Sequence, residues 1–149
     1  MRIEDEIKQK KFKSEHQKMY INLVYTANWM STQQMRMFKE FGLSVQQYNI
    51  LRILRGQVPN AVNLGLIQDR MLDKNSNASR LIEKLKIKKL VERKESKIDR
   101  RQVDIMITEK GLDLLKKMDG KVEEAELINS NLTKQEAETL SDLLDKLRG

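Results

Sequence analysis

The 149-residue chain is long enough for one domain with a full hydrophobic core and too short for two. It contains no cysteine, which excludes disulfides, thiol-based redox sensing and cysteine-rich zinc sites. Its formal charge of +7 favours a polyanionic partner, although a basic balance alone also predicts non-specific attraction.

An apolar stripe at helical spacing predicts a long first helix over residues 7–41, which Gly42 ends in the left-handed C′ position. The stripe consists of Met19, Tyr20, Leu23, Val24, Ala27, Met30, Met37 and Phe38. At about 1.5 Å per residue, such a helix is on the order of 50 Å long, and a single domain of this size cannot cover it. We therefore expect part of the stripe to contact another chain.

Two short helices and a tight turn are predicted next. Ser44 and Gln47 form the sequence pattern of a capping box, which starts a helix that Gly56 ends. The following helix is predicted over residues 64–72, where apolar residues recur at helical spacing. Residues 73–74 form the turn into the third helix, so this part of the chain indicates a helix-turn-helix.

The helix predicted over residues 75–90 has two contrasting faces. Its apolar stripe consists of Ala78, Leu81, Ile82 and Leu85. The opposite face starts with short hydrogen-bonding groups and continues with cations: Asn75, Ser76, Asn77, Ser79, Arg80 and Lys84. Between residues 74 and 101 there are 11 Lys or Arg and 4 Asp or Glu, an excess equal to the charge of the whole chain. The positive charge is therefore concentrated in this part of the chain.

A β-hairpin and two further helices complete the prediction. Residues 91–96, VERKES, precede a charged turn and the alternating run VDIMIT over residues 103–108, which is typical of a half-buried strand. Thr108 caps the next amphipathic helix, and Thr133 with Glu136 forms a second capping box before the last one. The expected order is a helical arm, a winged helix-turn-helix and a second helical arm.

Residues 99–111, DRRQVDIMITEKG, resemble the wing signature of the multiple-antibiotic-resistance regulator (MarR) family. In that family an Asp and an Arg at the wing tip precede an alternating strand and a Thr-x-x-Gly helix start. The segments 44–54, 79–81 and 90–93 also resemble the family in the same order, so the resemblance spans essentially the whole chain. Lys89 departs from it, because the family commonly has a glycine there. Lysine tolerates left-handed geometry poorly, so we expect a differently shaped corner.

The resemblance implies a mainly α fold with a small β-hairpin wing. A winged helix-turn-helix over residues 43–108 is flanked by dimerisation helices over residues 1–42 and 109–149. The resemblance also implies an obligate homodimer that binds double-stranded DNA at a pseudo-palindromic operator, as a repressor. A small phenolic or otherwise lipophilic ligand is implied to bind between arm and winged domain and to loosen DNA binding.

The candidate DNA contacts lie on the third predicted helix of the winged domain and on the wing. They are Asn75, Ser76, Asn77, Ser79, Arg80 and Lys84 on the helix, and Lys97, Arg100 and Arg101 on the wing. Arginine can bridge guanine O6 and N7, asparagine can pair with adenine, and a narrow minor groove attracts wing arginines. Asp99 is implied by the resemblance to orient the wing arginines. The alternative is that serine and asparagine only cap the helix and that the wing tip is an exposed turn.

Three aromatic residues are candidates for lining a ligand pocket near the arm–domain junction: Tyr20, Trp29 and Tyr48. Core or dimer packing is the alternative for each of them. The single histidine, His16, lacks the partners that a metal site requires, so we expect no metal. No pattern for nucleophilic catalysis and no phosphate-binding glycine loop is present, so we expect neither a cofactor nor an enzyme.

No apolar run approaches the length of about 18 residues that spans a membrane, and no signal peptide is evident. We expect a cytoplasmic protein with no membrane partner. Two alternatives to a ligand-controlled regulator remain. One is a winged-helix interaction module whose basic face meets an acidic protein, and the other is a DNA-binding regulator without a small effector.

Overall fold

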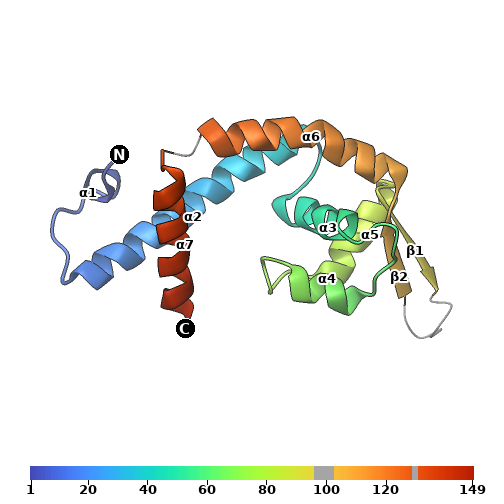
Figure 1. Cartoon of the computed structure of the whole chain (residues 1–149), viewed down its shortest axis with the longest axis horizontal. Coiled ribbons are helices and arrows are strands. Elements are labelled where there is room, and N and C mark those ends of the chain that lie inside the picture. Colours follow the sequence, from blue (N-terminus) through green and yellow to red (C-terminus); the bar gives the residue numbers. More distant parts are fainter. Residues whose placement is uncertain (96–102, 129–130) are drawn as a thin grey trace.

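A computed structural model of the chain describes residues 1–95, 103–128 and 131–149 (Figure 1). Its elements in chain order are α1 Ile3–Glu6, α2 Glu15–Glu40, α3 Val45–Arg55, α4 Leu64–Arg70, α5 Ala78–Ile87, β1 Val91–Glu95, β2 Val103–Ile107, α6 Glu109–Ile128 and α7 Lys134–Arg148. Helices α3 to α5 and the antiparallel β1–β2 hairpin gather at one end of the molecule, and α2 and α6 extend away from them. The predicted winged helix-turn-helix between helical arms is confirmed.

The first long helix starts later than the sequence pattern suggests. The side chain of Ser14 accepts a hydrogen bond from the Gln17 amide (3.2 Å), and the Lys13 amide donates to Gln17 Oε1 (2.7 Å). These two bonds cap α2 immediately before Glu15. The prediction that one helix also includes residues 7–14 is wrong, and the Ser-x-x-Gln capping pattern is the signal in the sequence that marks the true start.

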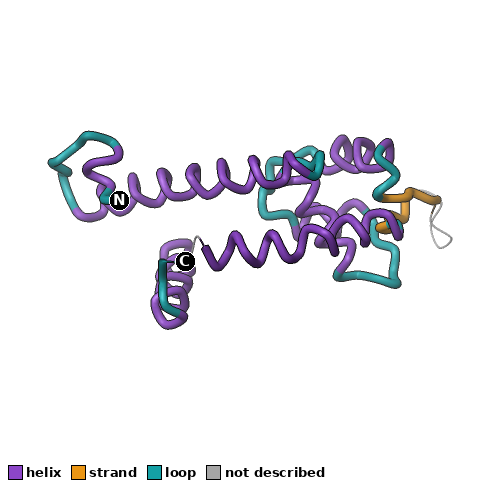
Figure 2. The backbone as a smooth tube through the Cα atoms, turned by 90° about the horizontal axis from the view of Figure 1, so that it is seen from above, coloured by secondary structure: helices purple, strands orange, loops and turns teal. Residues whose placement is uncertain are grey.

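The residues before α2 fold back against its first turns and form a hook at the free end of the arm (Figure 2). Lys18 Nζ lies 2.6 Å from Glu4 Oε1, and the Tyr25 hydroxyl donates to Glu6 Oε2 (2.5 Å). The hydrogen bond from Lys18 lowers the pKa of Glu4, and the bond to Glu6 raises the pKa of Tyr25. Ile3 is buried, so α1 is held by apolar contact as well as by polar bonds.

The hydrophobic core lies in the winged domain and is built around α3. Ile50, Leu51 and Leu54 of this helix are buried. The side chains that surround them come from α2, α4, α5, α6 and both strands: Phe38, Ile67, Ile82, Leu85, Val91, Ile105, Leu115 and Met118. Full burial of one such side chain stabilises the fold by about 1.5–3 kcal/mol. The core therefore fixes α5 firmly and determines which of its faces meets solvent.

The corner between α5 and β1 contains a lysine in the left-handed conformation. Lys89 has φ +61°, and two bonds close a Schellman motif around it: the Leu90 amide donates to the Leu85 carbonyl (3.0 Å) and the Lys89 amide to the Lys86 carbonyl (2.8 Å). The Thr108 hydroxyl also donates to the Lys89 carbonyl (2.9 Å). The expectation of a differently shaped corner is wrong, because these bonds hold Lys89 in the left-handed conformation that glycine commonly adopts at the end of a helix.

Replacing Lys89 with glycine should stabilise the protein. Glycine adopts positive φ without the steric cost that lysine has there, and its greater freedom in the unfolded chain offsets part of this advantage. We therefore expect the free energy of unfolding to rise by about 0.5–1 kcal/mol. Urea denaturation measures the change. The matched control Lys86→Gly, within α5, should lower the stability by about 1 kcal/mol. Equal losses in both variants would contradict strain at Lys89.

The helices outside the winged domain expose much apolar surface. Large side chains of α2 are exposed, among them Met19, Val24, Met30 and Met35. In α7 the stripe of Leu140, Leu143 and Leu147 is exposed, and Leu143 retains 58 % of its accessible surface. Figure 2 shows α2 and α6 leaving the winged domain in the same direction, with α7 crosswise at the far end of α6. Within the described part of the chain, no helix combines the length and apolarity needed to cross a membrane.

Candidate nucleic-acid interface

Helix α5 presents a polar face to solvent while its apolar stripe is buried. Ala78, Ile82 and Leu85 are buried against the rest of the winged domain. On the other side, Ser79, Arg80 and Lys84 are exposed. Burial of the stripe therefore fixes the orientation of the cations as well as the position of the helix.

The helix starts three residues later than predicted. Asn77 is the N-cap, and its side chain accepts a hydrogen bond from the Arg80 amide (3.0 Å). Asn75 and Ser76 lie in the preceding turn, where the Asn75 amide (3.0 Å) and the Ser76 hydroxyl (2.8 Å) both donate to the Asp73 carboxylate. The capping alternative thus holds for the side-chain oxygen of Asn77, Oδ1. The hydroxyl proton of Ser76 is already donated to Asp73.

Polar side chains of α3 hold this turn, and sequence reasoning missed them. The Leu72 amide donates to Asn49 Oδ1 (3.0 Å), and the Gln46 side chain hydrogen-bonds to Asp73. The hydrogen bond from the Ser76 hydroxyl has the largest effect on Asp73 and lowers its pKa, and the bond from the Asn75 amide lowers it further. An aspartate three residues before a serine at a predicted turn is the signal that was available, since aspartate often bonds the backbone two residues onward.

We expect Asp73→Asn to weaken the fold in a pH-dependent way. Because the folded-state pKa of Asp73 is lowered, the carboxylate stabilises the fold fully above its ordinary pKa of 3.8, and this stabilisation is lost as pH falls through the folded value. Urea denaturation should separate the variant from wild type at about pH 6, and the difference in stability should shrink as the pH falls below 3.8. Asp113→Asn, an exposed change on α6, is the control. A difference that does not shrink would contradict the role of Asp73.

The hairpin is fastened to α5 and to the loop before α4. Strand pairing places Val91 opposite Ile107, and Arg93 of β1 forms an ion pair with Glu83 of α5 (2.5 Å). Two backbone bonds join Val62 and Ile105 (3.0 and 2.8 Å). The base of the wing is therefore fixed relative to α5. The wing candidates lie outside the described residues: Lys97, Asp99, Arg100 and Arg101.

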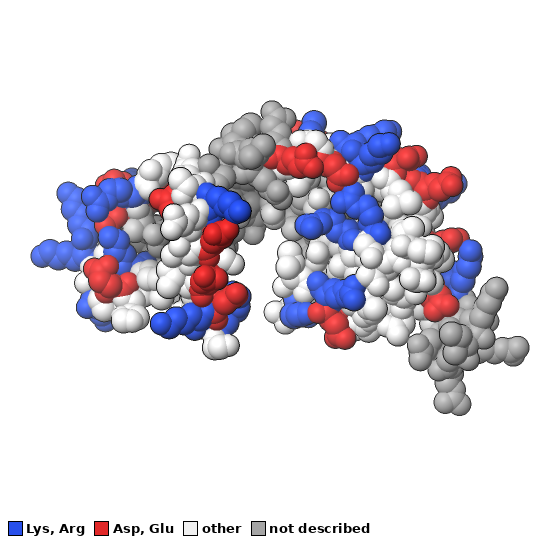
Figure 3. Space-filling model, viewed as in Figure 1, with Lys and Arg blue, Asp and Glu red and all other residues white. Residues whose placement is uncertain are grey.

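Residues 74–94, which include α5 and most of β1, are strongly basic. The two acidic side chains among them are both paired, Glu83 with Arg93 and Glu92 with Lys94 (3.1 Å). The other cations have no acidic partner among the described residues: Lys74, Arg80, Lys84, Lys86, Lys88 and Lys89. Figure 3 shows Lys and Arg side chains over the winged domain, and a further group at the free end of the arm. The winged domain thus offers unpaired cations beside the exposed face of α5.

The three aromatic candidates do not come together within one chain. Tyr48 retains only 7 % of its surface and stacks on Phe38 with ring centroids 4.3 Å apart, so it belongs to the core. Tyr20 is 64 % exposed, and Trp29 is half-buried. These last two lie nine residues apart on α2, which places them on opposite sides of the helix. His16 is exposed on α2, and the described residues contain no group of three His, Cys, Asp or Glu that could hold a metal ion.

The sequence matches no family model and no curated protein. Among solved structures, it is similar to the MarR transcription factor from Planctomyces limnophilus. The two share 32 % sequence identity over 92 % of this chain and 95 % of that one, with a TM-score of 0.69. The chain belongs to the MarR family. The family predicted from the wing signature and from the order of the other segments is therefore confirmed.

Two more distant structures share the fold of this MarR protein. One is the S. aureus regulator MepR in complex with DNA, at 20 % identity over 92 % of this chain and 97 % of that one, with a TM-score of 0.76. The other is the organohalide-sensing regulator RdhR bound to 2,4-dichlorophenol, at 18 % identity over 94 % of this chain and 85 % of that one, with a TM-score of 0.76. The winged helix-turn-helix with its helical arms is thus the fold of transcription regulators.

Proposed function

We propose that this MarR protein is a sequence-specific DNA-binding repressor that acts as a homodimer on a pseudo-palindromic operator. The observation that carries this function is the exposed polar face of α5, held rigidly by the buried Ala78, Ile82 and Leu85. A helix fixed in this way, with unpaired cations beside it, suits the major groove of B-DNA. Family membership supports the same function, as does the fold shared with a regulator crystallised on DNA.

The side chains divide between base readout and phosphate contact. Arg80 reads a guanine, since its guanidinium can donate two hydrogen bonds to O6 and N7. Lys84, further along α5, contacts a phosphate. The remaining proposed contacts are Asn75, Ser76, Asn77 and Ser79 beside Arg80, and Lys97, Arg100 and Arg101 on the wing, where Asp99 orients the arginines. The bonds at the helix start limit what Ser76 and Asn77 offer: Ser76 retains acceptor capacity, and Asn77 retains its amide donors.

Residues 1–42 and 109–149 form the dimer interface in this proposal. The exposed apolar side chains of α2 and α7 need a partner, since large contiguous apolar patches on a single chain mark interaction sites. In this proposal a two-fold axis relates the two protomers, and the two α5 helices read half-sites about one DNA turn apart. A small lipophilic effector then acts by favouring a dimer geometry with a different spacing, which requires different affinities for the two geometries. The dichlorophenol-bound neighbour supports this class of effector.

The dimer can be tested on α7. Leu143→Glu places a charge in the proposed interface, and we expect a dimer of the wild type to become a monomer at micromolar concentration. Leu143 is already 58 % exposed in the single chain, so the change leaves the fold of one protomer intact. Sedimentation equilibrium measures the mass, and Lys146→Glu on the same helix is the control. A wild-type monomer would contradict the proposed architecture.

Selection of bound sequences from a random duplex pool tests the function directly. We expect an inverted repeat with half-sites centred about 10 bp apart, because each protomer reads one half-site. Two alternatives predict different results. A DNA-binding regulator without an effector gives the same motif, with no response to lipophilic acids. Recovery without any motif would instead favour a winged-helix module whose basic face binds an acidic protein.

A further inference from the structure

The turn between α4 and α5, residues 71–77, exposes a large aliphatic side chain. Met71 lies in the core, whereas Leu72, the next residue, retains 84 % of its accessible surface. Within the described part of the winged domain, no other large apolar side chain is as exposed. A single exposed leucine is common on protein surfaces, so its significance depends on where it lies and how firmly it is held.

The backbone of this turn is fixed to two neighbouring helices. The Leu72 amide donates to Asn49 Oδ1 of α3 (3.0 Å), and Lys74 Nζ donates to the Asp69 carbonyl oxygen of α4. The Asp73 carboxylate closes the rest of the turn through the bonds described above. Because its backbone is already ordered, Leu72 loses little conformational freedom when a partner covers its side chain.

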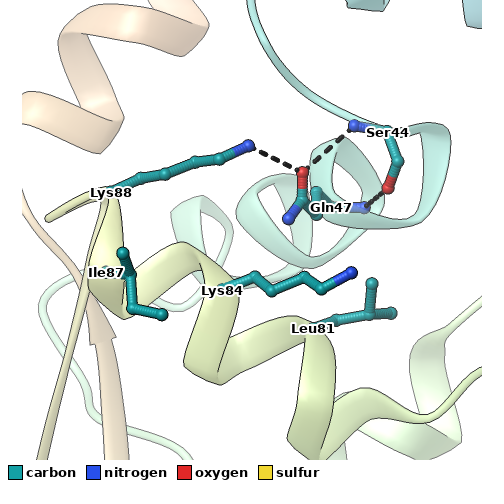
Figure 4. Close-up of a pocket in the computed structure, with 6 residues that line it drawn as sticks. All are labelled: Ser44, Gln47, Leu81, Lys84, Ile87 and Lys88. Atoms are coloured by element: carbon teal, nitrogen blue, oxygen red, sulfur yellow. Dashed lines mark hydrogen bonds between the residues drawn. The ribbon is translucent and has the colours of Figure 1, made fainter.

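Helix α3 holds α5 at its other end as well. Lys88 Nζ, just after α5, donates to Gln47 Oε1 of α3 (3.2 Å), as Figure 4 shows. Gln47 is buried, and its side-chain oxygen also accepts a bond from the Ser44 amide (3.1 Å). The turn and α5 are therefore fixed to the same helix, so the position of Leu72 relative to the exposed face of α5 is set.

Leu72 lies beside the surface that the proposed function assigns to DNA. It precedes Asn75 and Ser76, two of the proposed contacts, in the same closed turn. Figure 1 shows this turn on the side of the winged domain that faces away from α6, where β1 ends and β2 begins. In a helix-turn-helix the start of the second helix enters the major groove, so the turn before it approaches the base edges.

The chemical nature of Leu72 restricts what its side chain can contact there. Phosphates and most groups on the base edges are charged or hydrogen-bonding, and leucine offers neither charge nor donor. The 5-methyl group of thymine is the apolar feature of the major-groove edge. An aliphatic side chain that covers this methyl removes apolar surface of both groups from water, which stabilises the contact.

We propose that Leu72 reads a thymine in each half-site by contact of its side chain with the 5-methyl group in the major groove. This reading rests on the proposed function, because it requires that α5 enters the groove of an operator. It adds a contact that depends on the methyl group, whereas the polar side chains of α5 recognise hydrogen-bond donors and acceptors.

Replacement of thymine by deoxyuridine tests this contact, because uracil keeps every hydrogen-bonding group of thymine and lacks only the methyl. Each thymine of one half-site of the selected operator is replaced in turn, and fluorescence anisotropy measures binding of the wild type and of Leu72→Ala. We expect one replacement to weaken wild-type binding about three- to fivefold, as the loss of one buried methyl implies, and to leave Leu72→Ala unaffected. Responses to uracil that are the same in both proteins at every position would overturn the proposal, as would a half-site without thymine.

Two further variants show whether the effect belongs to the side chain of Leu72. Leu72→Met keeps a long apolar side chain and should retain the response to uracil. Val58→Ala shortens another exposed aliphatic side chain, in the loop before α4, and should respond like the wild type. Leu72→Ala retains the amide that donates to Asn49, so urea denaturation should show unchanged stability. Loss of the uracil response in Val58→Ala as well would show that the effect is not specific to Leu72 and would overturn the contact.

A second selection separates this reading from the proposed function. Leu72→Ala, selected against the same random duplex pool, should recover the same inverted repeat with a weaker preference for thymine at one position of each half-site. An unchanged motif would overturn the reading by Leu72 and leave the proposed function intact. If the wild type recovers no motif, the proposed function is wrong, and the reading by Leu72 is wrong with it.

Discussion

Replacing Gly111 with alanine should lower the free energy of unfolding by about 2–3 kcal/mol, since overpacking a closed site forces its neighbours apart. A β-carbon at this position would overlap the Leu90 carbonyl oxygen and would lie 2.6 Å from Ile107 Cγ1. The first contact is with backbone, which cannot rotate away as a flexible side chain can. The start of α6 would have to move off the base of the wing.

A second glycine of the same helix provides the control. A β-carbon at Gly120 meets nothing within 4 Å in the single chain, so Gly120→Ala should stabilise the protein by about 0.5–1 kcal/mol through helix propensity alone. Urea denaturation of both variants measures the contrast. If Gly111→Ala is as stable as wild type, the start of α6 does not pack closely against Leu90 and Ile107.

This corner joins the end of α5, the base of the wing and the start of α6. Thr108 accepts a bond from the Gly111 amide (3.1 Å), and its hydroxyl donates to the Lys89 carbonyl (2.9 Å). Lys110 Nζ donates to the Lys88 carbonyl (3.0 Å). The Thr-x-x-Gly pattern in the wing signature therefore has a physical basis. The threonine hydroxyl bonds both the Lys89 carbonyl and the Gly111 amide, and glycine allows the Leu90 backbone, immediately before β1, to pass close to α6.

Local patterns were sufficient to predict most of the fold. The capping boxes at Ser44 and Thr133 are present as expected, because each depends on residues three positions apart. Gly42 has φ +68°, as a C′ residue requires. The buried stripe of α5 follows directly from helical spacing. In each of these cases the sequence contains both partners of the interaction within one or two helical turns.

Contacts between segments that lie far apart in the sequence could not be predicted from such local patterns. The hook at the N-terminus depends on Glu4 meeting Lys18, a contact that requires the chain to reverse. The position of Tyr48 depends on such a contact as well, since its ring stacks on Phe38 of α2 and the residue is buried in the core. The turn before α5 depends on Asp73, whose bond to Gln46 of α3 cannot be seen from the segment alone. Spacing within a segment carries no information about these pairings.

Arg80→Ala should weaken binding to the selected operator by roughly 1–3 kcal/mol and should weaken binding to random DNA much less. The variant isolates the guanidinium, because the bond that Arg80 makes to the N-cap Asn77 uses its backbone amide, which alanine retains. Alanine also has high helix propensity, so α5 remains formed. The loss therefore reports the contacts of the side chain with the bases.

Fluorescence anisotropy with the operator and with a scrambled duplex, at one fixed salt concentration, measures both affinities. Lys84→Ala is the matched comparison on the same helix. Because Lys84 is a proposed phosphate contact, its loss should weaken binding to both duplexes about equally, and the number of counterions released on binding should fall by about one. If Arg80→Ala behaves like Lys84→Ala, Arg80 contacts the backbone, and sequence must be read by other residues near the start of α5. If only the operator is affected, the polar face of α5 is a reading surface, and its orientation is set by the buried stripe on the opposite side.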